Sequence, residues 1–149
     1  MNAVDTNVLI YVNDSRYPSK QAIAASLVAN LTAGVLIWQV ACEYLAASRK
    51  LEPFGYDRAQ AYQYIRDLQQ VWYTALPTWA VINRAEDLMI RFSLSHWDSM
   101  VVAACLHIFL ALGLSLTSVH MSFMVLYTLF SGFLMMGVAL TLKAQKEAN

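Results

Sequence analysis

Three acidic residues, Asp5, Glu43 and Asp98, each adjoin an apolar stretch in positions where carboxylates could bind a divalent cation. A hard cation such as Mg²⁺ takes oxygen ligands and keeps several waters, so two or three carboxylates suffice to hold it against a phosphate. Such ions orient water and stabilise the leaving oxygen in phosphodiester hydrolysis. If the fold brings the three acids together, they predict a magnesium site with hydrolytic chemistry.

The segment around Asp5 is expected to be a strand. The run 2–11 is rich in Val, Leu and Ile, which is typical of a buried strand that ends in a functional loop. Asp5 and Asn7 would then lie on this strand and at its exit. Apolar residues at helical spacing predict a helix next, over 19–33.

The expected helix over 19–33 has suitable residues at both ends, since Ser19 can cap its start and Gly34 can close its end. The β-branched and aromatic run 35–38 predicts a second strand. Good helix formers with a basic end then predict a helix over 39–50, which carries the second acid.

Strands and helices are expected to keep alternating after residue 50. The further elements are a helix over 57–70 capped by Asp57, a strand over 71–75, a helix over 78–92 capped by Thr78, and a helix that starts at Ser95. This alternation predicts an α/β fold with a parallel sheet flanked by helices. In such sheets the site lies beyond the carboxyl ends of the strands, where the three acids are expected.

The composition fits one cytoplasmic domain without an overall positive charge that would attract nucleic acid. The chain has 149 residues, is 58% hydrophobic and carries 10 basic and 10 acidic residues, so contact with RNA must be local. Cys42 and Cys105 lie in apolar helical patterns without metal-binding spacing. They predict buried thiols in a reducing compartment, and the cytoplasm is the expected location.

The local sequence around each acid resembles that of the PIN-domain nucleases, in particular the VapC-type toxins of bacterial toxin–antitoxin pairs. The segment VDTNVLIY is similar to the first strand of that family, and QVACEYLAASRK is similar to its second motif. The segment RFSLSHWDSMVVAACL is similar to its third motif. Together these matches span residues 2–106 in the order that the family has.

The resemblance implies a PIN-like domain over residues 1–106 and a Mg²⁺- or Mn²⁺-dependent endoribonuclease. The implied site residues are the catalytic and metal-binding acids Asp5, Glu43 and Asp98 and the supporting polar residues Thr6 and Asn7. The implied partners are an RNA substrate, a cognate antitoxin that holds the enzyme inactive, and a second copy of the chain in a homodimer.

One feature of the family has no counterpart here. Its members usually follow the third motif with a short strand and a fourth acid, whereas the next acid after Asp98 in this chain is Glu147. The absence weakens a two-ion site more than a one-ion site, which Asp5, Glu43 and Asp98 could form. A catalytically inactive PIN remnant that still binds an antitoxin is therefore the alternative function.

The region 107–149 is expected to be an atypical hydrophobic tail. Residues 121–142 are uncharged and mostly apolar, long enough to form a membrane-spanning helix, and Lys143 and Lys146 follow as a cytoplasmic flank would. Two explanations remain open. A natural anchor would tether the protein to the membrane, whereas a reading-frame slip near Leu106 would replace the last strand of the family with an unselected sequence.

Each acid also has a purely structural interpretation. Asp5 could cap a turn, although an acid in an apolar strand is costly unless it is paired or metal-bound. Glu43 could be a solvated helix residue, and Asp98 could close a capping box that begins at Ser95.

Other side chains carry weaker signals. The three histidines, His96, His107 and His120, have no spacing suited to zinc. Basic residues that could meet phosphate are Arg49, Lys50 and Arg58, although such residues usually only keep a surface soluble. Aromatic residues that could stack on bases or receive an antitoxin helix, but are expected mainly in the core, are Tyr62, Tyr64, Trp72, Tyr73 and Trp79.

Overall fold

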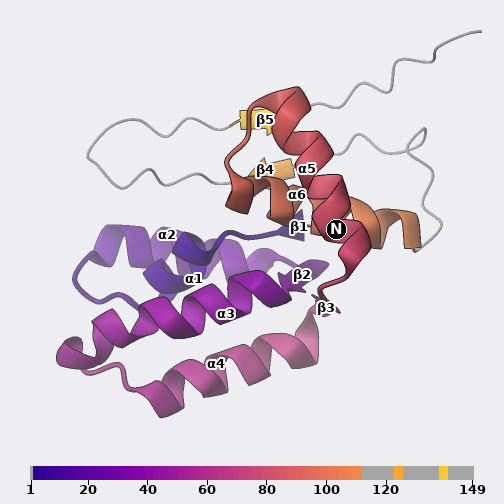
Figure 1. The fold of residues 1–149 in the computed structure, drawn as a ribbon. Helices are drawn as coiled ribbons and strands as arrows, with labels where there is room; N and C mark the ends of the chain where they lie inside the picture. Colours follow the sequence, from indigo (N-terminus) through magenta and orange to yellow (C-terminus); the bar gives the residue numbers. More distant parts are fainter. Residues whose placement is uncertain (1, 112–122, 126–137, 141–149) are drawn as a thin grey trace, which may run out of the picture.

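The computed structural model describes residues 2–111, 123–125 and 138–140, and its central feature is a small parallel sheet (Figure 1). The three strands, in spatial order, are β1 (Asn2–Ala3), β2 (Gly34–Ile37) and β3 (Tyr73–Ala75). Ala3 pairs with Val35, and Ile37 pairs with Ala75, so the carboxyl ends of the strands meet at one edge. The expected α/β class with a parallel sheet is confirmed.

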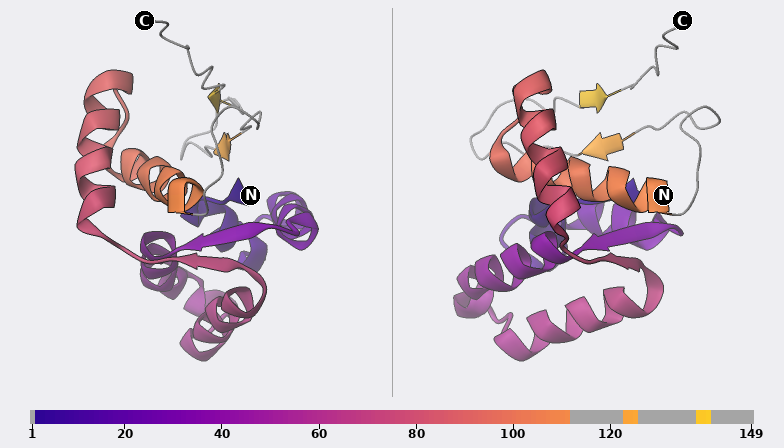
Figure 2. Two further views of the ribbon diagram at one scale, coloured as in Figure 1. Left: turned by 90° about the vertical axis from the view of Figure 1, so that its right-hand side faces the viewer. Right: turned by 45° about the vertical axis from the view of Figure 1, so that its right-hand side comes forward.

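Helices cover both faces of the sheet. They are α1 (Thr6–Asn13), α2 (Pro18–Asn30), α3 (Trp38–Ala47), the 3₁₀ helix η1 (Ser48–Phe54), α4 (Arg58–Val71), α5 (Trp79–Phe92) and α6 (His96–Ala111). Figure 2 shows α5 and α6 on one side of β2 and β3 and α4 on the other. The core lies where α1, α3 and β2 meet, and Leu9, Leu36 and Tyr44 are almost completely buried there.

The expected strand over 2–11 is wrong for most of its length. β1 ends at Ala3, and α1 begins at Thr6 after Asp5, which is the N-cap. A short apolar run does not by itself distinguish a strand from a buried helix. Here the cap favours the helix, which buries Val8 and Leu9 as it packs against α2 and α3. Asn7 therefore lies in a helix rather than at a strand exit.

The second helix also begins and ends differently from the expectation. Pro18 is its first residue and Tyr17 its N-cap, so Ser19 does not cap it. A proline suits this position because its missing N–H has no partner in a first helical turn. The helix ends at Asn30, and Gly34 is the first residue of β2 rather than a helix stop.

The later elements agree well with the local signals. Asp57 caps α4 in a capping box with Gln60, and the side chain of Thr78 accepts a hydrogen bond from Val81 at the start of α5. The helix expected over 39–50 is divided into α3 and η1. Pro53 lies within η1, where α-helical hydrogen bonding cannot continue.

The expected helix over 121–142 is not supported. The parts of this segment that the structure describes are two short antiparallel strands, β4 (Phe123–Val125) and β5 (Val138–Leu140). Residues 126–137 and 141–149 lie outside the described residues, and so does 112–122. Within 2–111, 123–125 and 138–140, no helix is both long and apolar enough to cross a membrane. The boundary expected after residue 106 falls inside α6.

Gly34 lies in β2 because the Trp72 indole occupies the space that a side chain would need. A Cβ built on Gly34 would overlap the Trp72 ring, and both residues are buried. The tryptophan follows α4 directly and precedes β3. The close approach of β2 to this ring therefore requires glycine.

Gly34→Ala is expected to destabilise the protein by about 1–3 kcal/mol, the usual cost of overpacking a core. Urea unfolding followed by circular dichroism would measure this loss. In a Trp72→Leu background the same substitution should cost much less, because the indole is gone. An equal cost in both backgrounds would contradict the proposed clash.

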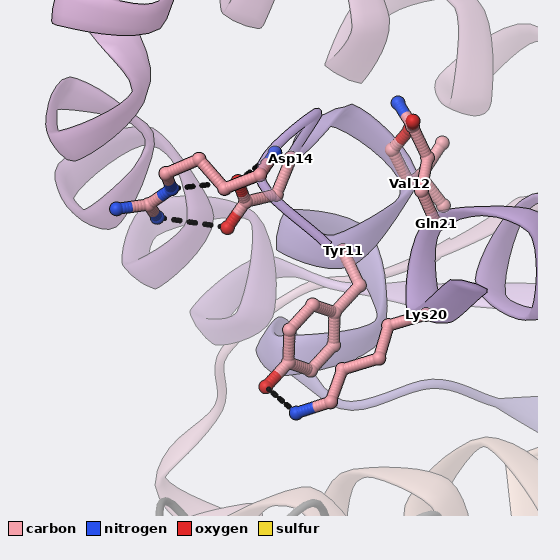
Figure 3. A network of polar contacts seen from close by, with 6 residues as sticks. Tyr11, Val12, Asp14, Lys20 and Gln21 are labelled. Atoms are coloured by element: carbon pink, nitrogen blue, oxygen red, sulfur yellow. Dashed lines mark hydrogen bonds and ion pairs between the residues drawn. The ribbon is translucent and has the colours of Figure 1, made fainter. Parts of the chain in front are cut away.

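Asp14 is a buried acid that the sequence did not single out (Figure 3). It ends α1 and accepts two hydrogen bonds of 2.8 Å from the Arg16 guanidinium, together with one of 3.2 Å from the Arg16 backbone N–H. The hydrogen bonds from the Arg16 side chain are the main reason that the pKa of Asp14 lies below its usual 3.8. This ion pair fixes the turn between α1 and α2.

Asp14→Asn is expected to lower the melting temperature at about pH 7, because the amide loses the charge that pairs with Arg16. An acid whose pKa is lowered by folding stabilises the fold above its unfolded-state pKa, and this contribution is lost as pH falls through the folded-state pKa. The difference in melting temperature between the variant and the natural chain should therefore be largest near neutral pH and shrink below pH 3.8. A difference that stays constant over this range in thermal scans would refute the assignment.

Candidate active site

Asp5 lies at the carboxyl edge of the sheet, two residues after β1. As the N-cap of α1 it accepts a hydrogen bond of 2.7 Å on Oδ1 from the Thr6 backbone N–H. The side chain of Asn7 donates to its Oδ2 at 3.0 Å. The first turn of α1 therefore holds both oxygens of this half-buried carboxylate.

Glu43 is held between α1 and α3. It lies in the second turn of α3, which follows β2 without an intervening loop. Thr6 Oγ1 donates to Glu43 Oε2 at 2.8 Å, and Gln39 Nε2 donates to Glu43 Oε1 at 2.8 Å. The buried Thr6 thus joins the two acids, because its backbone N–H contacts Asp5 and its hydroxyl contacts Glu43.

Asp98 lies in the first turn of α6 and takes part in its cap. The Asp98 backbone N–H donates to Ser95 Oγ at 3.2 Å, and the Ser95 hydroxyl donates in turn to the Asp98 carboxylate. The expected capping role is therefore present. The carboxylate is only half-buried, so capping and a role in a site are compatible.

The three acids are close enough to interact electrostatically. The pKa of Asp5 is raised, first because burial disfavours the charged form and further because Glu43 and Asp98 repel it. The hydrogen bonds from Asn7 and from the Thr6 backbone act in the opposite direction. A cation among these carboxylates would relieve both the burial cost and the repulsion.

The donor types suit a hard cation, since all three acids offer oxygen ligands. Their side chains are held by Thr6, Asn7, Gln39 and Ser95 rather than gathered around one point. In the described part of the chain, no group of three or more His, Cys, Asp and Glu side chains is arranged to hold a metal ion. What the fold provides is the Asp5 carboxylate at the start of α1, which Glu43 of α3 and Asp98 at the start of α6 both repel.

Sequence reasoning missed Gln39 and the two tryptophans beside the acids. Gln39 and Glu43 are four residues apart, and this spacing on one helix face could have indicated their contact. Trp38 and Trp97 line a cavity of about 130 Å³ at the same edge of the sheet. Nothing in their spacing, 59 positions apart in the chain, indicated that they would come together.

The aromatic set expected mainly in the core is mostly exposed. Trp72 is buried and Tyr64 packs against the core, but Tyr62, Tyr73 and Trp79 are exposed, Trp79 by 79%. The expectation of core packing is therefore wrong for these three. Strand β3 leaves the side chain of Tyr73 on its exposed face, and Tyr62 and Trp79 lie on outer faces of α4 and α5.

The remaining candidates lie apart from the three acids or have ordinary surroundings. Arg49 and Lys50 are exposed in η1, beyond the far end of α3, and Arg58 is exposed at the start of α4. Cys105 is buried, which raises the pKa of its thiol to about 12. Cys42 is exposed, so the expectation that both thiols are buried is wrong for it: it lies on the solvent side of α3.

The described residues thus define an α/β protein with a three-stranded parallel sheet and three interacting acids near its carboxyl edge. No protein-family model matches the chain, and no curated protein matches its sequence significantly.

Proposed function

We propose that this protein is a metal-dependent endoribonuclease with a PIN-like domain, similar to the VapC-type toxins. The observation that supports this most directly is the electrostatic interaction of Asp5 with Glu43 and Asp98 at the carboxyl edge of the sheet. These are the three acids that the resemblance to PIN-domain nucleases selects. Such repulsion between half-buried carboxylates is costly unless a cation or a proton offsets it.

The three acids would hold Mg²⁺ or Mn²⁺, which when bound supplies charge neutralisation for the phosphate and a more acidic water. Thr6 and Gln39 each donate one hydrogen bond to Glu43 and so orient its carboxylate. Asn7 and the Thr6 backbone do the same for Asp5. One of the three carboxylates accepts a hydrogen bond from the attacking water and directs it at the phosphorus atom.

The proposal includes the partners that the resemblance implies. The substrate is cellular RNA, the regulator is a cognate antitoxin, the assembly is a homodimer, and the location is the cytoplasm. A second candidate is a catalytically inactive PIN-like protein that still binds an antitoxin. It is favoured by the sequence, which has no acid between Asp98 and Glu147.

Cleavage of total cellular RNA by the purified full-length chain tests the proposal. We expect internal cleavage of RNA with Mg²⁺ or Mn²⁺ and none with a chelator. A folded sample that cleaves no RNA with either metal would reject the enzyme. Binding of that sample to a co-expressed antitoxin would then favour the inactive protein.

Thr6→Val should reduce cleavage about tenfold, because partners that orient a metal ligand typically contribute 10- to 100-fold to affinity or activity. Valine keeps the volume of this buried side chain and removes only the hydroxyl that donates to Glu43. Cleavage rates over a range of Mg²⁺ concentrations would measure the effect. Thr32→Val, at an exposed position before β2, is the matched control and should leave the rates unchanged.

A further inference from the structure

A small apolar cavity lies beside the candidate acids and has no role in the chemistry described so far. Its volume is about 130 Å³. Ile37 and Ala75, the last residues of β2 and β3, line it together with Met100 of α6. A cavity of about 150 Å³ lined by apolar side chains can hold a benzene molecule. The cavity therefore has the size of one six-membered ring.

Gln39 lies in the wall of this cavity and also contacts Glu43. Its Nε2 donates to Glu43, and because a carboxylate only accepts, this bond fixes which end of the amide is the oxygen. Among the described residues, Gln39 Oε1 has no hydrogen-bond partner and is buried. Because this oxygen is not exposed to the cavity, the contribution of Gln39 is to connect the cavity wall to the carboxylate of Glu43.

Two tryptophans give the cavity aromatic walls. Trp38 and Trp97 line it, and they remain 49% and 60% exposed. Each is next in sequence to a polar group of the candidate site, since Trp38 precedes Gln39 and Trp97 precedes Asp98. Exposed indole rings bind unpaired nucleobases by stacking. A nucleotide with its base in this cavity would have its phosphate beside the acids.

We propose that the cavity is a subsite for a pyrimidine base of the RNA substrate. The base would stack on Trp38 and Trp97. Cytosine and uracil have one ring, which matches the size of the cavity, whereas purines have two fused rings. RNA is the occupant that fits best, because the exposed indoles offer stacking faces and the cavity adjoins Glu43 through Gln39. The inference rests on the proposed ribonuclease function and adds a base preference to it.

The test is binding of short fluorescent oligo-C, oligo-U and oligo-A RNA to the full-length Asp5→Asn variant, which is expected neither to bind the metal nor to cleave, measured by anisotropy. Oligo-C and oligo-U should bind about tenfold more tightly than oligo-A. Adding Trp97→Leu should weaken pyrimidine binding about tenfold, the effect of losing one stacking partner. Trp79→Leu is the matched control: Trp79 is 79% exposed and lies outside the cavity, so its loss should change nothing.

Circular dichroism would check that the Trp97→Leu variant is folded. Equal binding of oligo-A and oligo-C would overturn the subsite, as would no binding of either. Unchanged pyrimidine binding after Trp97→Leu would also overturn it and favour a protein side chain as the occupant. Cleavage by the natural chain is measured independently. Cleavage without a pyrimidine preference would reject this inference alone, whereas the preference without cleavage would support it and reject the enzyme.

Discussion

Asp5→Asn should abolish metal-dependent RNA cleavage, with a loss greater than about 100-fold, because removing a ligand exceeds the 10- to 100-fold effect of removing a partner of a ligand. Inhibition of growth on expression should be lost as well. The fold should survive, since asparagine is as good an N-cap as aspartate and can still accept from the Thr6 backbone N–H. Without metal the variant should unfold at the same or a higher temperature, because the repulsion from Glu43 and Asp98 is relieved.

Metal binding to this site can be measured without any RNA. A ligand at 100 times its dissociation constant stabilises a protein by about 2.7 kcal/mol, so saturating Mg²⁺ or Mn²⁺ should raise the melting temperature of the natural chain by several degrees. This rise should vanish in Asp5→Asn. Asp57→Asn makes the same chemical change at the exposed N-cap of α4 and should keep both the metal response and cleavage. Full cleavage by Asp5→Asn would contradict the assignment of Asp5 to the active site.

Asp98→Asn should reduce cleavage on the order of 100-fold or more, because it also removes a proposed metal ligand. For this residue, the effect of losing the ligand must be separated from the effect on the cap of α6. Asparagine can still accept a hydrogen bond from Ser95, so the start of α6 should remain in place. Ser95→Ala is the complementary change. It removes the cap but keeps the carboxylate, and the loss of a cap costs about 1 kcal/mol of stability.

The two variants should therefore differ in which property they lose most, stability or cleavage. Well below its melting temperature, Ser95→Ala should cleave RNA about tenfold more slowly than the natural chain, the effect of losing a partner of a ligand, and should unfold earlier. Asp98→Asn should unfold normally and lose cleavage on the order of 100-fold or more. Rates and melting curves measured on the same samples would separate the effects. If both variants lose the same small fraction of activity, Asp98 only caps α6.

The elements that were predicted correctly depend on residues close together in the chain. Asp57 and Gln60 form the capping box of α4, and Thr78 caps α5 through a contact three residues away. Such contacts can be predicted from the sequence because the two partners are only three residues apart. Strand β2 was also predicted well, since all four of its residues are buried and it reads as a continuous apolar run.

The errors concern segments whose conformation depends on distant partners. The run 2–11 could form a strand or a buried helix, and the packing of α1 against α2 and α3 favours the helix. Gly34 looked like a helix stop, but its role is set by Trp72, 38 positions later in the chain. Residues 123–125 and 138–140 looked like parts of one apolar helix, yet they pair with each other as antiparallel strands.

The features of the candidate site fall into the same two groups, those set by neighbours in the chain and those set by distant partners. The sequence by itself determined which acids are present, that Asp98 adjoins a helix start, and the alternation that leads to a parallel α/β sheet. Only the tertiary structure decided that Thr6, next to Asp5, contacts Glu43 at a separation of 37 positions, that Gln39 keeps one unpaired acceptor, and that Trp38 and Trp97 line the same cavity. The physical reason is that caps and periodic patterns act between neighbours in the chain, whereas the positions of these side chains follow from which helices pack against which face of the sheet.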